Sequence, residues 1–250
     1  MFSPEEREGL RDDLLAAASR DPRISGGAIT GSAALDNLDR WSDIDLAFGV
    51  TDAAQITGVV GDWTERMYRE HGAQHHMDVT AGSWIYRVFL LRNTLQVDLA
   101  FAPAAEFGAR APSFRLIFGA AVELPYGAPP TAESLIGWAW LYALHARSSI
   151  ARGRLWQAEY MVSAMRDQVL ALACLRHGLP AREGRGMDQL PAAVTRPLEE
   201  ALVRRLDREE LQRAFAAVAR SFAAEIVRAD VALGERLGAV LNELVESAHE

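Results

Sequence analysis

The chain has 250 residues, enough for one large domain or for two domains of ordinary size. Its hydrophobic fraction of 50% and charged fraction of 24% are typical of globular proteins and exclude a disordered or fibrous chain. The net charge is −8 and all 26 basic residues are arginine, which excludes mechanisms that need a lysine Schiff base or a P-loop lysine. The acidic balance argues against nucleic acid as a partner and favours a cationic small molecule.

The sequence carries no targeting signal that we can identify. Its acidic N-terminal segment lacks the apolar stretch of a secretory signal, and no run of about 18 apolar residues predicts a membrane span. The single cysteine, Cys174, can form no internal disulfide, which is consistent with a reducing compartment. We therefore expect a cytoplasmic protein without a membrane segment.

The first half of the chain predicts a mixed α/β unit. Ser3 and Pro4 have the properties of an N-cap and a first helical residue, and a helix is predicted to continue to about Ser19. Segments rich in branched and aromatic residues predict strands, and residues 51–70 predict a helix between two of them. The predicted strands lie at residues 24–30, 43–50, 73–79, 84–91 and 95–101.

The composition changes after the glycine and proline residues at positions 125–130, which predicts a domain boundary there. Alanine, leucine and arginine then recur at helical period, as in a helical bundle. We expect an α/β (α+β) domain with a mixed sheet at residues 1–127, followed by an all-α helical bundle at residues 128–250. The predicted helices of the bundle lie at residues 132–151, 154–177, 198–208, 209–227 and 231–247.

Four aromatic residues lie among apolar neighbours in the predicted bundle. Aromatic residues in such a setting usually fill a core, so we expect them to be buried. The alternative is that one of them stacks on a substrate. The four are Trp138, Trp140, Tyr142 and Trp156.

Three aspartates predict a metal site. Asp43 and Asp45 are two residues apart on a predicted strand, so their side chains point to the same side. Two carboxylates held this close repel each other unless a cation lies between them, and Mg²⁺ prefers such oxygen ligands. Asp98, in an apolar predicted strand, would bring a third carboxylate from a neighbouring strand. Alternatively, Asp98 forms an ion pair with Arg87 or Arg92.

Gly31 and Ser32 predict a phosphate site beside these acids. A glycine at the end of a strand lets the backbone approach a ligand closely, and Ser32 would open a helix at residues 33–38 with its hydroxyl beside free N–H groups. Phosphate binds well at such a helix start. Together, the two motifs predict a nucleoside triphosphate whose Mg²⁺ is held by Asp43 and Asp45.

Ten residues separate Gly31 and Ser32 from the Asp43 and Asp45 pair, and Asp98 follows as a third acid. In this pattern the chain resembles the nucleotidyltransferase superfamily related to DNA polymerase β, and within it the antibiotic adenylyltransferases that act on aminoglycosides and lincosamides. The resemblance implies ATP as co-substrate, Mg²⁺, and transfer of AMP to a hydroxyl of a small cationic acceptor, with release of pyrophosphate and a role in antibiotic resistance. It rests on the first half of the chain, and the second half is similar in architecture alone.

The chain departs from that family at the phosphate site. Many members carry a basic residue soon after the Gly-Ser pair, whereas residues 33–35 are apolar here, so an arginine from elsewhere must meet the phosphate charge. The glycine-rich loop at residues 182–188 offers Arg182 and Arg185 as a clamp for the triphosphate. The alternative is a loop that is simply solvated.

Two acids are candidates for the general base that deprotonates the acceptor. Glu159 lies on a predicted helix, and the resemblance to kanamycin-type enzymes implies that a glutamate of the helical domain takes this role. The alternative for Glu159 is an ion pair with Arg152 or Arg166. Asp98 is the rival, because a third carboxylate near the attacking hydroxyl can accept its proton.

Two other functions stay open from the sequence. The acceptor could be a hydroxyl of a protein, as in toxin-neutralising or regulatory nucleotidyltransferases. The chain could also be a binding module that keeps the fold without catalysis and binds a partner through the helical bundle. The intact acids argue against this last function.

Overall fold

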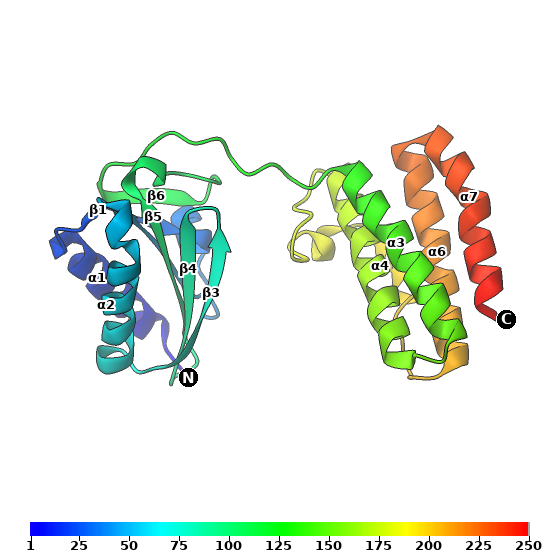
Figure 1. The fold of residues 1–250 in the computed structure, drawn as a ribbon, viewed down its shortest axis with the longest axis horizontal. Coiled ribbons are helices and arrows are strands. Elements are labelled where there is room, and N and C mark those ends of the chain that lie inside the picture. The colour runs from blue at the N-terminus through cyan, green and yellow to red at the C-terminus, as the bar shows by residue number, and fades with distance from the viewer. Residues whose placement is uncertain (250) are drawn as a thin grey trace. The chain divides into compact units, whose positions relative to one another are not determined.

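The computed structural model describes residues 1–249, which form two compact units, Met1–Gly127 and Ala128–Glu250. Each unit has a hydrophobic core of its own (Figure 1). The first unit contains a mixed sheet with helices and the second is helical, which confirms the expected fold class. We propose that these two units are separate domains.

The first unit is built around one six-stranded sheet with the strand order β3-β4-β5-β2-β1-β6. The central strands β2 and β5 run parallel, and every other neighbouring pair is antiparallel. Parallel neighbours need a long crossover connection, and a helix and a β-hairpin supply it here. The strands are β1 Ile24–Thr30, β2 Ile44–Val50, β3 Ala73–Ala81, β4 Trp84–Leu91, β5 Gln96–Pro103 and β6 Phe114–Gly119.

The five predicted strands are confirmed, with ends that differ by one or two residues, but β6 was not predicted. This strand lies at the edge of the sheet and pairs only with β1, so much of it is exposed and its sequence lacks a clear buried face. Gly27 on β1 lies against the ring of Phe118, where a Cβ would overlap with it. The close approach of β6 therefore depends on a glycine of the neighbouring strand.

Two helices, α1 (Pro4–Arg20) and α2 (Ile56–Glu70), cover one face of this sheet (Figure 1). The predicted first helix is confirmed, and Ser3 caps it in a capping box with Glu6. Fully buried side chains of the sheet, such as Phe48 and Leu99, pack beneath the helices. Burial of each such side chain stabilises the fold by roughly 1.5–3 kcal/mol.

The alternation of side chains along β2 and β5 separates this packed face from a second one. Leu46 and Phe48 belong to the core under the helices, so Asp45 and Ala47 project from the opposite face. In β5, Asp98 lies directly opposite Asp45 in the parallel register. Asp45 and Asp98 therefore lie on the face that the helices leave uncovered.

The second unit is a bundle whose longest helices pack around an alanine-rich core. Four of the five predicted helices are confirmed, whereas the helix predicted at residues 198–208 is wrong, because a shorter helix precedes it and residues 200–207 form turns. Among the described residues, no helix has the length and apolar character needed to cross a bilayer. The helices are α3 Ala132–Ala151, α4 Leu155–Arg176, α5 Ala192–Glu199, α6 Arg208–Ala229 and α7 Val231–Glu246.

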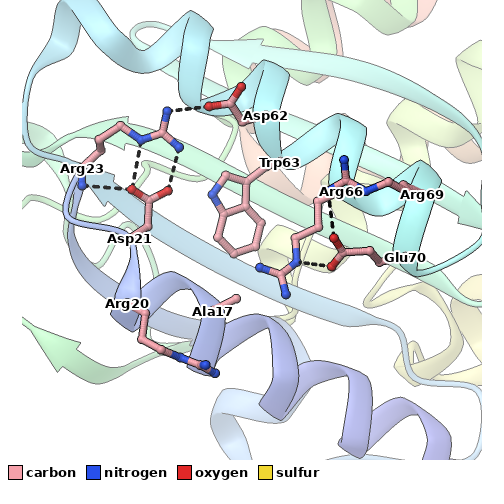
Figure 2. A pocket seen from close by; sticks show the side chains of 9 residues that line it. All are labelled: Ala17, Arg20, Asp21, Arg23, Asp62, Trp63, Arg66, Arg69 and Glu70. Atoms are coloured by element: carbon pink, nitrogen blue, oxygen red, sulfur yellow. Dashed lines mark hydrogen bonds and ion pairs between the residues drawn. The ribbon is translucent and has the colours of Figure 1, made fainter.

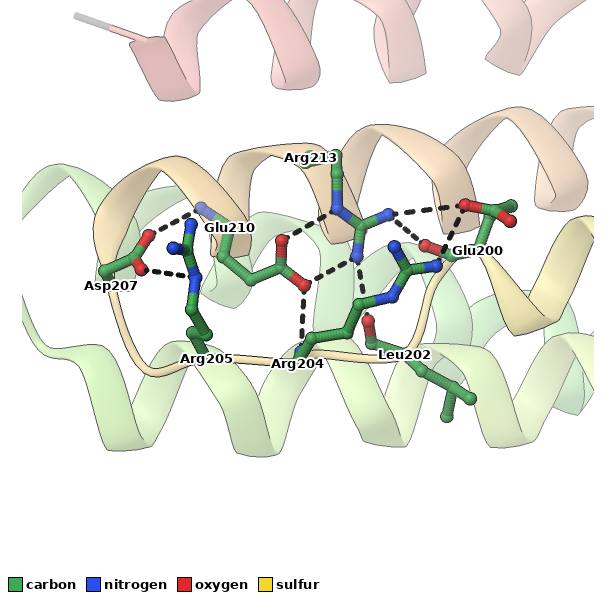
Figure 3. Close-up of polar contacts among 7 residues, drawn as sticks. All are labelled: Glu200, Leu202, Arg204, Arg205, Asp207, Glu210 and Arg213. Atoms are coloured by element: carbon green, nitrogen blue, oxygen red, sulfur yellow. Dashed lines mark hydrogen bonds and ion pairs between the residues drawn. The ribbon is translucent and has the colours of Figure 1, made fainter.

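Polar side chains of α6 hold the turns that replace the predicted helix (Figure 3). Asp207 caps α6 by accepting a hydrogen bond from the N–H of Glu210 at 2.9 Å. The Glu210 carboxylate accepts from the N–H of Arg204 at 2.8 Å, and Arg213 donates to the carbonyl of Leu202 at 2.8 Å. These side chains satisfy backbone groups that a helix would otherwise pair, which is why the chain can turn here.

The prediction that the aromatic residues of the bundle are buried was wrong for three tryptophans. Trp138, Trp140 and Trp156 are 49%, 41% and 77% exposed, and only Tyr142 packs against the core. The buried face of α3 is built instead from small side chains such as Ala143. Small residues let helices approach closely, so the indoles are left on the outer surface.

Candidate metal and phosphate site

Three carboxylates come together at one edge of the uncovered sheet face. Asp45 and Asp98 are direct neighbours in the parallel register of β2 and β5, and Asp43 immediately precedes β2. Each offers an oxygen atom, and these three atoms all lie within 4.8 Å of one another. All three residues are half-buried, so a cation could reach them from solvent. The cluster is compatible with metal binding.

The local sequence explains why these acids converge. Each acid in a strand alternates with buried aliphatic neighbours, Ile44 and Leu46 in β2 and Val97 in β5. The aliphatic side chains are drawn into the core, which turns the intervening carboxylates to the other face. Because β2 and β5 are parallel and in register, the acids lie side by side.

The electrostatics of the cluster penalise ionisation in the absence of a cation. The pKa of Asp98 is raised from its ordinary value of 3.8 to about 6, mainly by burial; a hydrogen bond from Gln96 opposes the rise and the nearby charge of Asp43 adds to it. A divalent cation at this position would offset the repulsion between the carboxylates. The donor set therefore fits a hard cation such as Mg²⁺.

Gln96 is a residue of the cluster that the sequence analysis missed. Its side-chain amide donates to Asp98 Oδ1 at 3.0 Å and to Asp43 Oδ2 at 3.3 Å, and so bridges two of the carboxylates. The signal was available, because Gln96 lies two residues before Asp98 on one strand and must share its face.

The alternative pairing of Asp98 with an arginine is not observed within residues 1–249. Arg87 instead forms an ion pair with Asp78 at 2.6 Å. Arg92 is exposed, and no ion pair joins it to Asp98 in the described part of the chain. The carboxylate of Asp98 is thus available to the cluster.

Gly31 brings the backbone against the Asp45 carboxylate. Its φ is +63°, a conformation that other residues rarely adopt, and a Cβ built at this position would overlap with Asp45 Oδ2. Both the backbone angle and the space therefore require a glycine here. The main chain after β1 therefore lies directly against the carboxylate of Asp45.

The helix predicted to begin at Ser32 is wrong. Gly31–Leu35 forms a single turn of 3₁₀ helix, and Asp36, in the left-handed region at a φ of 54°, ends it. One short turn sums few peptide dipoles, so it attracts an anion less than a full helix would. Phosphate binding here would depend on individual N–H groups and on the Ser32 hydroxyl.

Arg115 lies beside this turn and was also missed. From β6, its guanidinium donates to the carbonyl of Ala33 at 3.0 Å and to Asp36 Oδ1 at 2.8 Å. No sequence signal pointed to it, because β6 itself was not predicted. Arg115, which is ion-paired with Asp36, is thus a further candidate for the arginine that would meet the phosphate charge, and that role stays a prediction.

The predicted base Glu159 lies in the second unit, on α4. It is half-buried and accepts a hydrogen bond from the hydroxyl of Ser163 at 2.7 Å. Within the described chain it forms no ion pair with Arg152 or Arg166, and the latter lies 3.4 Å from Asp167 instead. Its role as a base stays a prediction.

Arg182 and Arg185 also belong to the second unit, in the loop before α5. Arg182 donates to the carbonyl of Ala128 at 2.9 Å, and Arg185 forms an ion pair with Glu183 at 2.8 Å. Both side chains are exposed. Their role as a triphosphate clamp stays a prediction.

Another hollow of the first unit, about 400 Å³ in volume, is formed by residues of α1, of α2 and of the segment between α1 and β1 (Figure 2). Two of its arginines are held by carboxylates: Arg23 contacts Asp21 at 2.8 Å and Asp62 at 2.6 Å, and Arg66 contacts Glu70 at 3.1 Å. This hollow lies with the helices, whereas the carboxylate cluster occupies the uncovered face. We interpret it as an ion-pair network that joins helix to sheet.

The comparisons with known proteins find similarity among solved structures. Neither a family model nor a curated protein sequence matches the chain. Among solved structures, it is similar to the crystal structure of an aminoglycoside 6-adenyltransferase from Bacillus subtilis, with a TM-score of 0.42 and 14% sequence identity. The alignment covers 98% of this chain and 99% of that one. A score this low does not establish a shared function.

Proposed function

We propose that this chain is a nucleotidyltransferase that moves a nucleoside monophosphate, AMP from ATP, to a hydroxyl of a small cationic acceptor and releases pyrophosphate. The observation that carries the proposal is the convergence of Asp43, Asp45 and Asp98 within 4.8 Å at the edge of a mixed sheet. The close approach of Gly31 to Asp45 supports it, because it places backbone next to the acids where phosphates would lie.

In this proposal Asp43 and Asp45 hold Mg²⁺, with Asp98 as a third ligand. Bound Mg²⁺ supplies charge neutralisation for the phosphates. The carboxylates orient the triphosphate for in-line attack on its α-phosphorus, and catalysis consists mainly of positioning and electrostatic stabilisation.

The phosphates lie against Gly31 and Ser32, with Arg115, which contacts Ala33 and Asp36 of the same turn, as the proposed source of positive charge in the first unit. A planar guanidinium carries a full positive charge and can donate two parallel hydrogen bonds to a phosphate. A glutamine amide can donate hydrogen bonds but is neutral. Arg182 and Arg185 are proposed as a further clamp from the second unit.

The acceptor hydroxyl loses its proton to Asp98 or to Glu159. Asp98 lies in the carboxylate cluster, and Glu159 already accepts a hydrogen bond from a hydroxyl, that of Ser163. A metal-binding measurement distinguishes the two candidate bases. Glu159→Gln should leave metal binding unchanged, whereas Asp98→Asn should weaken it. The net charge of −8 supports a cationic acceptor such as an aminoglycoside.

The proposal is tested by incubating the protein with Mg²⁺ and ATP labelled at the α-phosphorus, together with a panel of aminoglycosides and, separately, with a cell lysate. Label on an aminoglycoside, absent with Asp45→Asn, supports the proposal. Label on a protein identifies a protein hydroxyl as the acceptor. Label on neither favours a binding module without catalysis.

A further inference from the structure

A cavity of about 140 Å³ lies on the sheet face that carries the carboxylates, wholly within the first unit. Ala47 on β2 and Ala100 on β5 line it, and each is two residues further along its strand than Asp45 or Asp98. Residues two apart on a strand share a face and lie about 7 Å from each other. The cavity therefore adjoins the carboxylate cluster.

Small residues create this cavity. Phe48, the neighbour of Ala47 on β2, is one of the large side chains on the helix-covered face. The opposite face carries Ala47 and Ala100. On the same face Phe107 clusters with Ala47 and Ala100 and packs onto Gly49, where a Cβ would come within 2.9 Å of its ring. The small side chains of Ala47 and Ala100 thus leave a hollow over β2 and β5.

Aromatic side chains form its walls. The rings of Trp84 and Tyr86 stack with centroids 5.7 Å apart and an interplanar angle of 20°, and Phe114 lines the cavity with them. Pockets for complete small ligands usually measure about 300–1,000 Å³, so this one has room for a single ring of a larger molecule. Flat apolar walls favour a ring over a flexible chain.

The polar side chains that line the cavity are the hydroxyls of Thr30 and Ser113 and the guanidinium of Arg110. A hydroxyl both donates and accepts hydrogen bonds, whereas a guanidinium only donates. The indole N–H of Trp84 has no partner among the described residues, but the nitrogen is itself buried and is not a group that a ligand contacts in this structure. The Arg110 guanidinium lies 5.9 Å from the Trp84 ring centre, which opposes a positively charged ring. A ring with hydroxyl groups and no positive charge of its own fits these partners.

We infer that this cavity is a binding subsite for one neutral six-membered ring that carries hydroxyl oxygens, a sugar or cyclitol ring of the acceptor. A ring seated here would present a hydroxyl toward Asp98, on the neighbouring position of the same face. The link to an acceptor rests on the proposed function, but ring binding itself is measured without turnover.

The experiment uses the full chain labelled with ¹⁵N, in which the indole N–H signals of the 6 tryptophans are recorded. Trp84→Phe assigns the signal of Trp84, and Trp138→Phe assigns an exposed control in the second unit. Titration with myo-inositol should shift the Trp84 signal and leave that of Trp138 in place. An unmoved Trp84 signal would overturn the inference, as would a shift produced by adenosine alone, which would identify a nucleobase subsite.

A second variant fills the cavity. Ala47→Val should weaken myo-inositol binding at least tenfold while Mn²⁺ binding to the carboxylates stays unchanged, because the added methyl groups occupy the floor and leave the acids in place. Ala47→Ser, which keeps the volume, should bind as the native protein does and serves as the matched control. Unchanged inositol binding in a folded Ala47→Val protein contradicts the inference. Inositol binding without any nucleotidyl transfer would leave it standing and refute the proposed function.

Discussion

The two units use their acidic residues in opposite ways. In the second unit, Glu225 is 3% exposed and lies between Arg176 at 3.0 Å and Arg228 at 2.6 Å, so its charge is neutralised within the fold. In the first unit, Asp43 and Asp98 lie beside a third carboxylate and share one neutral amide donor. Pairing with arginine offsets the cost of burying a carboxylate, whereas clustered carboxylates repel each other unless a cation joins them. The contrast distinguishes acids that are neutralised within the fold from acids that we propose to bind a cation.

Removal of one clustered acid should give the largest effect on activity. Asp45→Asn is expected to lower nucleotidyl transfer at least about 10³-fold, because a metal ligand is lost. Without metal, the variant should unfold at the same or a higher temperature than the native protein, since like-charge repulsion is relieved. Steady-state kinetics and thermal unfolding measure the two effects.

The exposed Asp12 on α1 is the matched control. Asp12→Asn should change neither turnover nor metal binding. If Asp45→Asn kept native turnover, or if both variants lost activity equally, the assignment of the cluster to catalysis would be wrong.

Gly31→Ala should disturb the carboxylate cluster without removing an acid, because the added Cβ would overlap with Asp45. Gly31 and Gly82 both have positive φ, +63° and +61°, but only the first lies against a carboxylate. Gly82→Ala should cost about 1–2 kcal/mol of stability through backbone strain alone. Gly31→Ala should cost more and also lower turnover by about 100-fold, because it displaces Asp45. Equal effects of the two substitutions on stability and turnover would argue against the close approach at Gly31.

Arg115→Gln should have a smaller, more specific effect. Loss of positive charge beside the turn at Gly31 is expected to raise the KM for ATP about tenfold and to change kcat little, because the guanidinium contributes mainly to phosphate binding. Arg92→Gln, at an exposed position of the same unit, is the control and should leave the KM unchanged. A native KM in Arg115→Gln would move the search for the phosphate-binding arginine to Arg182 and Arg185.

Glu210 of the second unit should affect stability with no change in turnover. Hydrogen bonds from Arg213, and then from the N–H of Arg204, lower the pKa of Glu210 from 4.5 to about 2. Because the folded pKa is the lower one, the stabilisation is complete above about pH 4.5 and is lost as the pH falls toward 2. Glu210→Gln should therefore be less stable than the native protein at pH 7, and the difference should shrink as the pH is lowered below 4.5.

Urea unfolding at several pH values measures this difference. Glu209→Gln, which removes an exposed acid from the same helical turn, should show none of it. A difference that stayed constant with pH would mean that the charge of Glu210 does not stabilise the fold.

Much of the fold followed from short-range signals in the sequence. Branched and aromatic residues predicted the strands at residues 84–91 and 95–101, and the Ser3 cap predicted the first helix, because both signals depend on neighbours along the chain. The edge strand β6 and the turns at residues 200–207 depend on contacts between distant residues, such as those of Arg213 with backbone carbonyls. A one-dimensional pattern does not contain those contacts.

Short-range sequence signals also predicted part of the candidate site and missed the rest. The i and i+2 spacing placed Asp43 and Asp45 on one face, and a polar residue within an apolar strand pointed to Asp98. Arg115 could not be found, because it comes from a strand that was not predicted. The length of the helix at Ser32 was overestimated, since the left-handed turn at Asp36 has no strong sequence signal. The catalytic roles of all these residues stay predictions.

The most direct test of the account is diffraction from crystals grown with Mn²⁺ and a non-hydrolysable ATP analogue, with the ion located by its anomalous signal. We expect Mn²⁺ bound by Asp43 and Asp45 at oxygen distances of about 2.1 Å, with phosphate oxygens completing its shell next to Gly31. A cluster that stays empty of metal under these conditions, or an ion held by other residues, would contradict the central claim that these carboxylates form a catalytic metal site.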